Sequence, residues 1–204
     1  MNSFEKLPIE KQARIVNASI SEFAERDYGN ASMNKVVEQA GISKGSLFNY
    51  FKTKSSLFFH IYHLAIGEVK SYLREVRDET AGLSFDVRLS KIVSAGIQFI
   101  TDHPRLARIY FRLVYSSESP HRKKILNELQ LMSGEYLGRI INDAIDRNEL
   151  NQNLNTTQAV FFLDAVLTRF LKEYHEALDS GEEERIEQGQ WVQGITDLFT
   201  KGLK

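Results

Sequence analysis

Helical spacing of apolar residues is the feature that most restricts what this chain can fold into. From Ile9 to Phe23, apolar side chains recur every three or four positions, which places them along one face of a helix. The same spacing returns in later segments as far as Phe199, and β-branched residues are not clustered into the short alternating runs typical of strands. With only 3 prolines in 204 residues, the pattern predicts an all-α protein of about nine helices.

Two short helices joined by a tight turn are predicted between residues 32 and 51. Ser32 can cap the first helix, Gly41 permits the turn, and Ser43 can cap the second helix. A preceding helix, which Gly29 can end in the left-handed conformation, would complete a three-helix unit. This arrangement is typical of a helix-turn-helix, whose second short helix enters the major groove of DNA.

The outward face of that second short helix is rich in hydrogen-bonding side chains. Asparagine can pair bidentately with adenine, and lysine can reach guanine O6 and N7. Glycine and serine are small and permit close approach to the duplex. The candidate DNA-reading residues on this face are Ser43, Lys44, Gly45, Ser46, Asn49 and Tyr50.

The net charge of the chain is only −1, so DNA affinity would have to come from a local concentration of positive charge. No acidic residue lies between Glu38 and Glu68, and this stretch contains Lys44, Lys52 and Lys54. Lys54 falls in the first turn of the next predicted helix, where a cation opposes the helix dipole unless a phosphate lies between them. The alternative explanation is an ordinary helical hairpin that carries a few surface lysines.

The segment from Gly41 to Lys54, GISKGSLFNYFKTK, closely resembles the recognition segment of TetR-family transcriptional regulators. The resemblance covers about the first 60 residues, and beyond residue 80 it is one of architecture only. It implies a helix-turn-helix DNA-binding domain over residues 1–53 and a helical ligand-binding and dimerisation domain over residues 54–204. The upstream positions that match the family pattern are Ile15, Ala18, Phe23, Gly29 and Ser32.

The same resemblance implies a ligand-responsive regulator, usually a repressor. Such a protein binds a near-palindromic double-stranded DNA operator as a homodimer and is released by a small-molecule effector. Phe48 stands where the family has an aromatic hydroxyl, and Ser55 where an acidic residue is common, so one phosphate contact is lost and the following helix start is less acidic. The implied phosphate-holding residues are Ser32, Lys35, Tyr50 and Lys54, and the implied groove-facing residues are Ser43, Lys44, Ser46 and Asn49.

The second half of the chain carries candidates for a dimer interface and an effector pocket. In the family the interface is usually built from the last two long helices, here about residues 157–178 and 184–202. Aromatic and apolar residues at helical spacing fill cores as often as interfaces or pockets, so each assignment competes with plain core. The candidate interface residues are Phe161, Phe170, Trp191, Ile195 and Phe199, and the candidate pocket residues are Phe99, Tyr110, Phe111, Tyr115, Tyr136 and Phe162.

Composition and motifs argue against other functions. Without cysteine there is no disulfide and no cysteine-built zinc site, and His60 and His63 share a helix face but lack a third ligand at matching spacing. We find no phosphate loop, nucleophile elbow or zincin motif, so no enzyme, metal or cofactor is expected. With no signal peptide and no apolar run of membrane length, we expect a cytoplasmic protein without a membrane partner. A ligand sensor that acts through protein contacts, and a small helical enzyme, remain as alternative functions.

Overall fold

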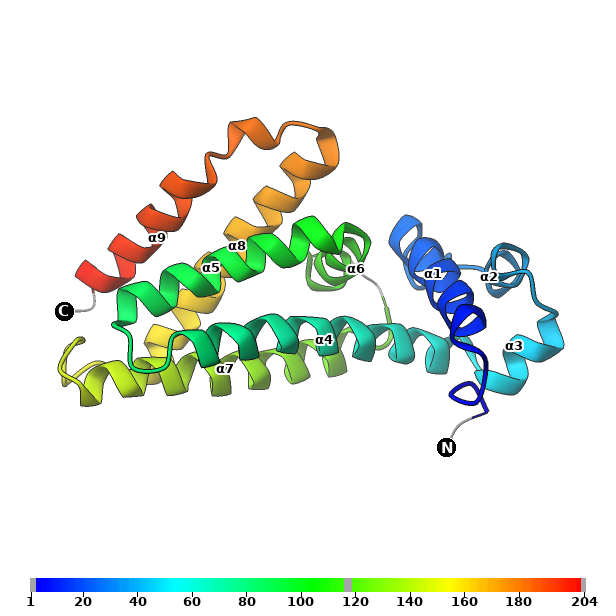
Figure 1. The fold of residues 1–204 in the computed structure, drawn as a ribbon, viewed down its shortest axis with the longest axis horizontal. Helices are drawn as coiled ribbons and strands as arrows, with labels where there is room; N and C mark the ends of the chain where they lie inside the picture. The colour runs from blue at the N-terminus through cyan, green and yellow to red at the C-terminus, as the bar shows by residue number, and fades with distance from the viewer. Residues whose placement is uncertain (1–2, 116–118, 203–204) are drawn as a thin grey trace. The chain divides into compact units, whose positions relative to one another are not determined.

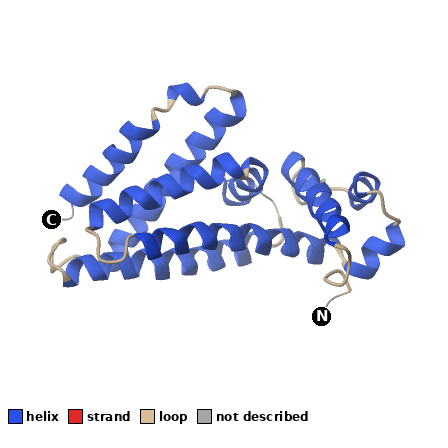
Figure 2. Cartoon of the chain, viewed as in Figure 1, coloured by secondary structure: helices blue, strands red, loops and turns tan. Residues whose placement is uncertain are grey.

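The computed structural model describes residues 3–115 and 119–202, and within them the chain is helical with no strand (Figure 1, Figure 2). These residues form nine α-helices and one short 3-10 helix, which confirms the prediction of an all-α protein. The helices are α1 (Ile9–Glu25), α2 (Met33–Ala40), α3 (Lys44–Tyr50), α4 (Lys54–Glu79), α5 (Phe85–Asp102), α6 (Pro104–Tyr115), α7 (Arg122–Asp146), α8 (Thr156–Ser180) and α9 (Gln188–Gly202), with the 3-10 helix at Glu183–Arg185. None of the described helices is both long and apolar enough to cross a membrane.

The chain divides into two compact units. The first contains residues 1–68 together with 105–122, and the second contains residues 69–104 together with 123–204. Helix α4 therefore contributes its first half to one unit and its second half to the other. The predicted division into a DNA-binding domain (residues 1–53) and a ligand-binding and dimerisation domain (residues 54–204) is a division by function. It stays a prediction.

The core of the first unit is built from one apolar face of each of its first helices. Ile15 and Phe23 of α1, Val36 of α2 and Leu47 of α3 are all buried. Phe58 of α4 closes this core, and its ring packs edge-on against Phe23 with centroids 5.1 Å apart. The apolar residues at helical spacing on α1, α2, α3 and the start of α4 thus pack into one shared core.

The turn between α2 and α3 depends on a glycine. Gly41 has a φ of +63°, in the left-handed region that residues with a Cβ rarely adopt. Its N–H donates to Glu38, and the N–H of Ile42 donates to Val37, which satisfies carbonyls at the end of α2. This tight turn leaves only residues 41–43 between the end of α2 and the start of α3.

The end of α1 differs from the prediction. The helix stops at Glu25, Arg26 is extended with a φ of −126°, and Gly29 is not among the glycines with positive φ. A separate turn follows, in which the Asp27 carboxylate accepts the N–H of Asn30 at 2.8 Å. The left-handed cap predicted at Gly29 is therefore wrong, because the aspartate side chain organises this turn.

The second unit is a bundle around α5, which contacts both α8 and α9. Leu89 and Val93 of α5 are buried together with residues of the other helices, including Leu163 of α8. Helices α5 and α8 approach closely at Gly96, where a Cβ atom would lie 2.8 Å from Cδ1 of Leu171. A larger residue at this position would require the end of the Leu171 side chain to move.

Candidate nucleic-acid interface

Two buried side chains anchor α3 and leave its predicted DNA-reading face open. Leu47 is fully buried, and Phe51, the residue that ends the helix, is also buried. The six predicted reading residues lie on α3 or at its N-cap: Ser43, Lys44, Gly45 and Asn49 are exposed, and Ser46 and Tyr50 are half-buried. The structure therefore gathers these residues on one short helix whose opposite side is held in the core.

The two serines predicted as helix caps behave differently. The Ser43 hydroxyl accepts the N–H of Ser46 at 3.1 Å, which confirms it as the cap of α3. Ser32 precedes α2, but its side chain makes no capping hydrogen bond, so the predicted cap is wrong. Instead, the N–H of Ser32 donates to the Glu22 carboxylate at 2.7 Å. A side chain of α1 thus binds the backbone at the start of α2, and the Ser32 hydroxyl does not cap the helix.

This difference predicts unequal effects of two serine-to-alanine substitutions. Ser43→Ala should lower the free energy of unfolding by about 1 kcal/mol, because an N-terminal amide of α3 loses its acceptor. Ser32→Ala should change it by less than about 0.5 kcal/mol, because no cap is lost. Urea unfolding followed by circular dichroism measures both, and an equal loss in the two variants would contradict the hydrogen bonds described here.

Lys54 does not present a bare ammonium group. Its Nζ donates to the carbonyl oxygens of Gly29 at 3.0 Å and Ala31 at 3.1 Å. It also lies 4.9 Å from the centroid of the Tyr28 ring, within the range of a cation–π interaction. The phosphate contact expected of Lys54 remains a prediction, but these contacts already account for a cation in the first turn of α4. Lys35, the other predicted phosphate-binding lysine, is exposed on α2.

Tyr50 has neighbours that sequence reasoning did not identify. Lys11 of α1 places its Nζ 5.8 Å from the Tyr50 ring centroid. Phe4 is buried against the rings of Tyr50 and Phe51, with centroids 6.3 and 4.9 Å away. No sequence signal links Phe4 and Lys11 to the end of α3, which lies about 40 or more positions later in the chain. The segment before α1 thus supports the end of α3, and Lys11 adds positive charge beside it.

Charge is unevenly divided between the two compact units. By sequence, the first unit holds 12 lysines and arginines against 8 acidic residues, and the second holds 14 against 19. The unit that contains α3 therefore has a net charge of +4, whereas the other unit has a net charge of −5. This local excess is what attraction to the phosphates of DNA requires.

No group of three or more potential metal ligands is found in the described part of the chain, which includes His60 and His63. His60 is half-buried, with its ring 5.0 Å from Phe4 and 5.1 Å from Phe51. Burial lowers the pKa of His60, His63 lowers it further, and Glu5 acts in the opposite direction. His60 is therefore part of an aromatic cluster with Phe4 and Phe51.

The six aromatic residues predicted to line an effector pocket are divided between the two compact units. Phe162 and Tyr115 are 57% and 43% exposed in the single chain, whereas residues that line a cavity are usually largely covered. Burial raises the pKa of Tyr136, whose hydroxyl donates to the carbonyl of Leu73 at 3.0 Å. Phe111 is buried, and Phe99, Tyr110 and Tyr136 are half-buried. The pocket assignment of all six residues stays a prediction.

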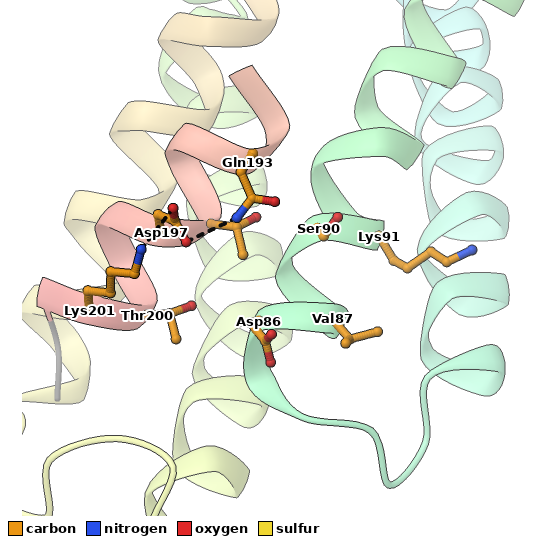
Figure 3. Close-up of a pocket in the computed structure, with 9 residues that line it drawn as sticks. Asp86, Val87, Ser90, Lys91, Gln193, Asp197, Thr200 and Lys201 are labelled. Atoms are coloured by element: carbon orange, nitrogen blue, oxygen red, sulfur yellow. Dashed lines mark hydrogen bonds and ion pairs between the residues drawn. The ribbon is translucent and has the colours of Figure 1, made fainter. Parts of the chain in front are cut away.

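A hollow of about 450 Å³ lies between α5 and α9, and it is polar rather than aromatic (Figure 3). Within it the Asp197 carboxylate pairs with Lys201 and accepts from Gln193, each at 3.0 Å, and these bonds lower the pKa of Asp197. None of the predicted pocket residues takes part. The hollow is lined by Asp86, Val87, Ser90, Lys91, Gln193, Thr196, Asp197, Thr200 and Lys201.

The five predicted interface residues fall into two groups. Phe170, Ile195 and Phe199 are at most 5% exposed in the single chain. The neighbouring helices already cover these three side chains in the single chain, and their place at an interface stays a prediction. Phe161 and Trp191 are exposed at 68% and 47% and keep their predicted role.

Comparison with known families agrees with this arrangement. Residues 15–61 match the family model described as bacterial regulatory proteins, tetR family. Residues 84–191, more than half of the chain, match the model described as tetracyclin repressor-like, C-terminal domain. The first match includes α2 and α3, and the second runs from the start of α5 to the start of α9.

Two relatives of known sequence are regulators from Bacillus subtilis (strain 168). The chain is 24% identical to the fatty acid metabolism regulator protein over 149 residues, which are 73% of this chain and 75% of that protein. It is 28% identical to the uncharacterised HTH-type transcriptional regulator YerO over 94 residues, which are 46% of this chain but only 32% of that protein.

Two solved structures share the fold over nearly the whole chain. A TetR family transcriptional regulator from Chloroflexus aurantiacus J-10-FL has a TM-score of 0.76 and 26% identity, covering 98% of this chain and 96% of that one. The transcriptional regulator FadR from Bacillus subtilis in complex with stearoyl-CoA has a TM-score of 0.74 and 16% identity, covering 94% and 99%. With α2 and α3 arranged as a helix-turn-helix and both halves of the chain matched, this protein belongs to the TetR family of DNA-binding transcriptional regulators.

Proposed function

We propose that this protein is a homodimeric repressor that binds a near-palindromic operator through α3 and leaves it when a small molecule binds. The observation that carries the proposal is the contrast between the two sides of α3. Leu47 is fully buried, whereas Lys44 and Asn49 are both exposed. A short helix held in this way and presenting such side chains suits the major groove.

The residues of α3 are proposed to divide the reading of bases. Lys44 suits guanine O6 and N7, and Asn49 suits the edge of adenine. Phe48 is 36% exposed, and the Lys44 ammonium lies 6.0 Å from its ring centroid. An exposed phenyl ring beside the reading residues can contact a thymine methyl group. Ser43, Gly45 and Ser46 permit close approach at the start of the helix.

Phosphate contacts are proposed for residues on either side of this helix. The Ser32 hydroxyl makes no cap, and Lys35 is exposed one turn later on α2. Tyr50 lies at the other end of α3, with Lys11 beside its ring. Contacts of this kind fix the register of a protein on the duplex and make its affinity depend on salt.

A dimer through α8 and α9 is supported by apolar side chains that the single chain leaves uncovered. A two-fold dimer needs a self-complementary surface, and large exposed apolar residues mark such surfaces. On these two helices the exposed large apolar residues are Phe161, Phe162, Trp191 and Leu198.

A route from effector to DNA is supported by contacts around the start of α7. His121, directly before α7, shares a hydrogen bond of 3.0 Å with Ser55 near the start of α4. Its ring also lies 5.0 Å from that of Tyr28, in the turn between α1 and α2. Because α4 and α7 both continue into the second unit, a ligand there that shifts either helix would disturb the turn before α2.

Selection from a random DNA pool with purified protein at near-physiological salt tests the proposal. The expected result is a palindrome whose half-sites suit a two-fold dimer. Stearoyl-CoA, which the FadR structure contains, is the first compound to add to the resulting complex. Failure to recover any specific sequence with folded dimer would contradict the operator proposal and favour a sensor that acts through protein contacts. Effector and DNA that bind independently would contradict the coupling.

A further inference from the structure

A single peptide unit at the start of α2 is held by charged groups on both sides. The carbonyl oxygen of Ala31 accepts from the Lys54 ammonium at 3.1 Å. The N–H of Ser32, which belongs to the same peptide, donates to the Glu22 carboxylate at 2.7 Å. The two side chains come from α4 and α1, so three helices meet at this peptide.

The burial of Glu22 indicates that this contact is specific. The residue is 1% exposed, and an unpaired carboxylate buried to that degree is costly to folding. Its partners are the Ser32 amide and the Arg26 guanidinium, whose Nε lies 3.7 Å away. Hydrogen bonds to charged groups are stronger than neutral ones, so this carboxylate holds the amide firmly.

The surroundings of Lys54 explain its position without DNA. A cation in the first turn of a helix is unfavourable with respect to the dipole. Here the ammonium has two carbonyl acceptors, and the face of Tyr28 lies 4.9 Å away. These contacts offset the unfavourable position and use the lysine to hold the turn that precedes α2.

We propose that Glu22 and Lys54 form a clamp on the Ala31–Ser32 peptide that sets where α2 begins relative to α1 and α4. In this role Lys54 is a positioning residue for DNA binding. The clamp binds the backbone N–H of Ser32 through the buried Glu22 carboxylate. The Ser32 hydroxyl makes no capping bond and can therefore contact a phosphate. The expected effect of the clamp on DNA binding rests on the proposed function, whereas its effect on folding does not.

A double-mutant cycle in the free protein tests the clamp. Lys54→Met and Glu22→Gln should each lower the folding equilibrium constant, the lysine change by roughly tenfold. The two losses should be less than additive when combined, because both changes act on one peptide. Lys52→Met is the matched control, since this exposed lysine lies two positions away and its removal should leave stability unchanged. Additive losses, or equal losses in the Lys52 and Lys54 variants, would overturn the clamp.

The salt dependence of DNA binding separates positioning from phosphate binding. Affinity for a mixed-sequence duplex is measured at several salt concentrations, under conditions in which every variant is folded. Lys54→Met should weaken binding with an unchanged slope of log affinity against log salt, and Lys54→Arg should restore affinity. A lost phosphate contact would instead reduce the slope by about 1, and that result without a loss of stability would overturn the proposal. If the unmodified protein bound no duplex, the proposed function would fail, whereas the unfolding cycle would still test the clamp.

Discussion

Replacement of both Lys44 and Asn49 by alanine is expected to abolish sequence-specific DNA binding while the fold is kept. Each residue is proposed to make one base contact, and loss of two such contacts should weaken specific binding by roughly 100-fold or more. Binding to mixed-sequence duplex should fall much less, because phosphate contacts remain. Both side chains are exposed, so unfolding should be little affected.

Fluorescence anisotropy with the selected palindrome and with mixed-sequence duplex measures this effect as a ratio of affinities. Lys52→Ala is the control for loss of one positive charge, because Lys52 is exposed and lies beyond the end of α3. The control should weaken binding to both duplexes alike. A double variant whose affinity ratio equals that of the unmodified protein would show that α3 does not read the bases.

Phe161→Glu is expected to convert the dimer into monomers. Phe161 is 68% exposed on α8, and a carboxylate at that position would have to be buried without a partner in the dimer. Loss of an aromatic contact near the centre of an interface alone costs about 2 kcal/mol or more, which weakens association by roughly 30-fold. DNA binding to a palindrome should fall as well, because a monomer contacts only one half-site.

Sedimentation velocity over a range of protein concentrations measures the association directly. Leu131→Glu is a closely matched control, since Leu131 is also 68% exposed but lies on α7, outside the proposed interface. The control should remain dimeric. A monomeric unmodified protein, or dissociation caused by the Leu131 change alone, would contradict an interface through α8 and α9.

Local features of the fold could be predicted because they depend on neighbours in sequence. The left-handed φ of Gly41 and the cap at Ser43 follow from the conformational preferences of glycine and from the reach of a serine hydroxyl over three residues. The buried stripe that includes Ile15 and Leu47 follows from helical periodicity. The exposed face of α3, and with it the candidate site, could be predicted because Leu47 identifies the side that must be covered.

The tertiary structure alone decided which groups hold these elements together. Lys54 bonds to carbonyls 23 and 25 residues away, and Glu22 bonds to an amide 10 residues away. Backbone carbonyls and amides are common to all residue types, so the sequence carries no mark of such partners. The Gly29 cap failed for a related reason, since the Asp27 side chain competed for the same turn.

The same distinction explains the second half of the chain. Its helices and their apolar faces were determined by the sequence, because the period of the α-helix selects which side chains share a face. Phe170 and Phe161 are the same residue type on one helix, yet one is 3% and the other 68% exposed. Burial depends on which other helix lies opposite each side chain, and that is a property of the packed chain rather than of any local stretch of sequence.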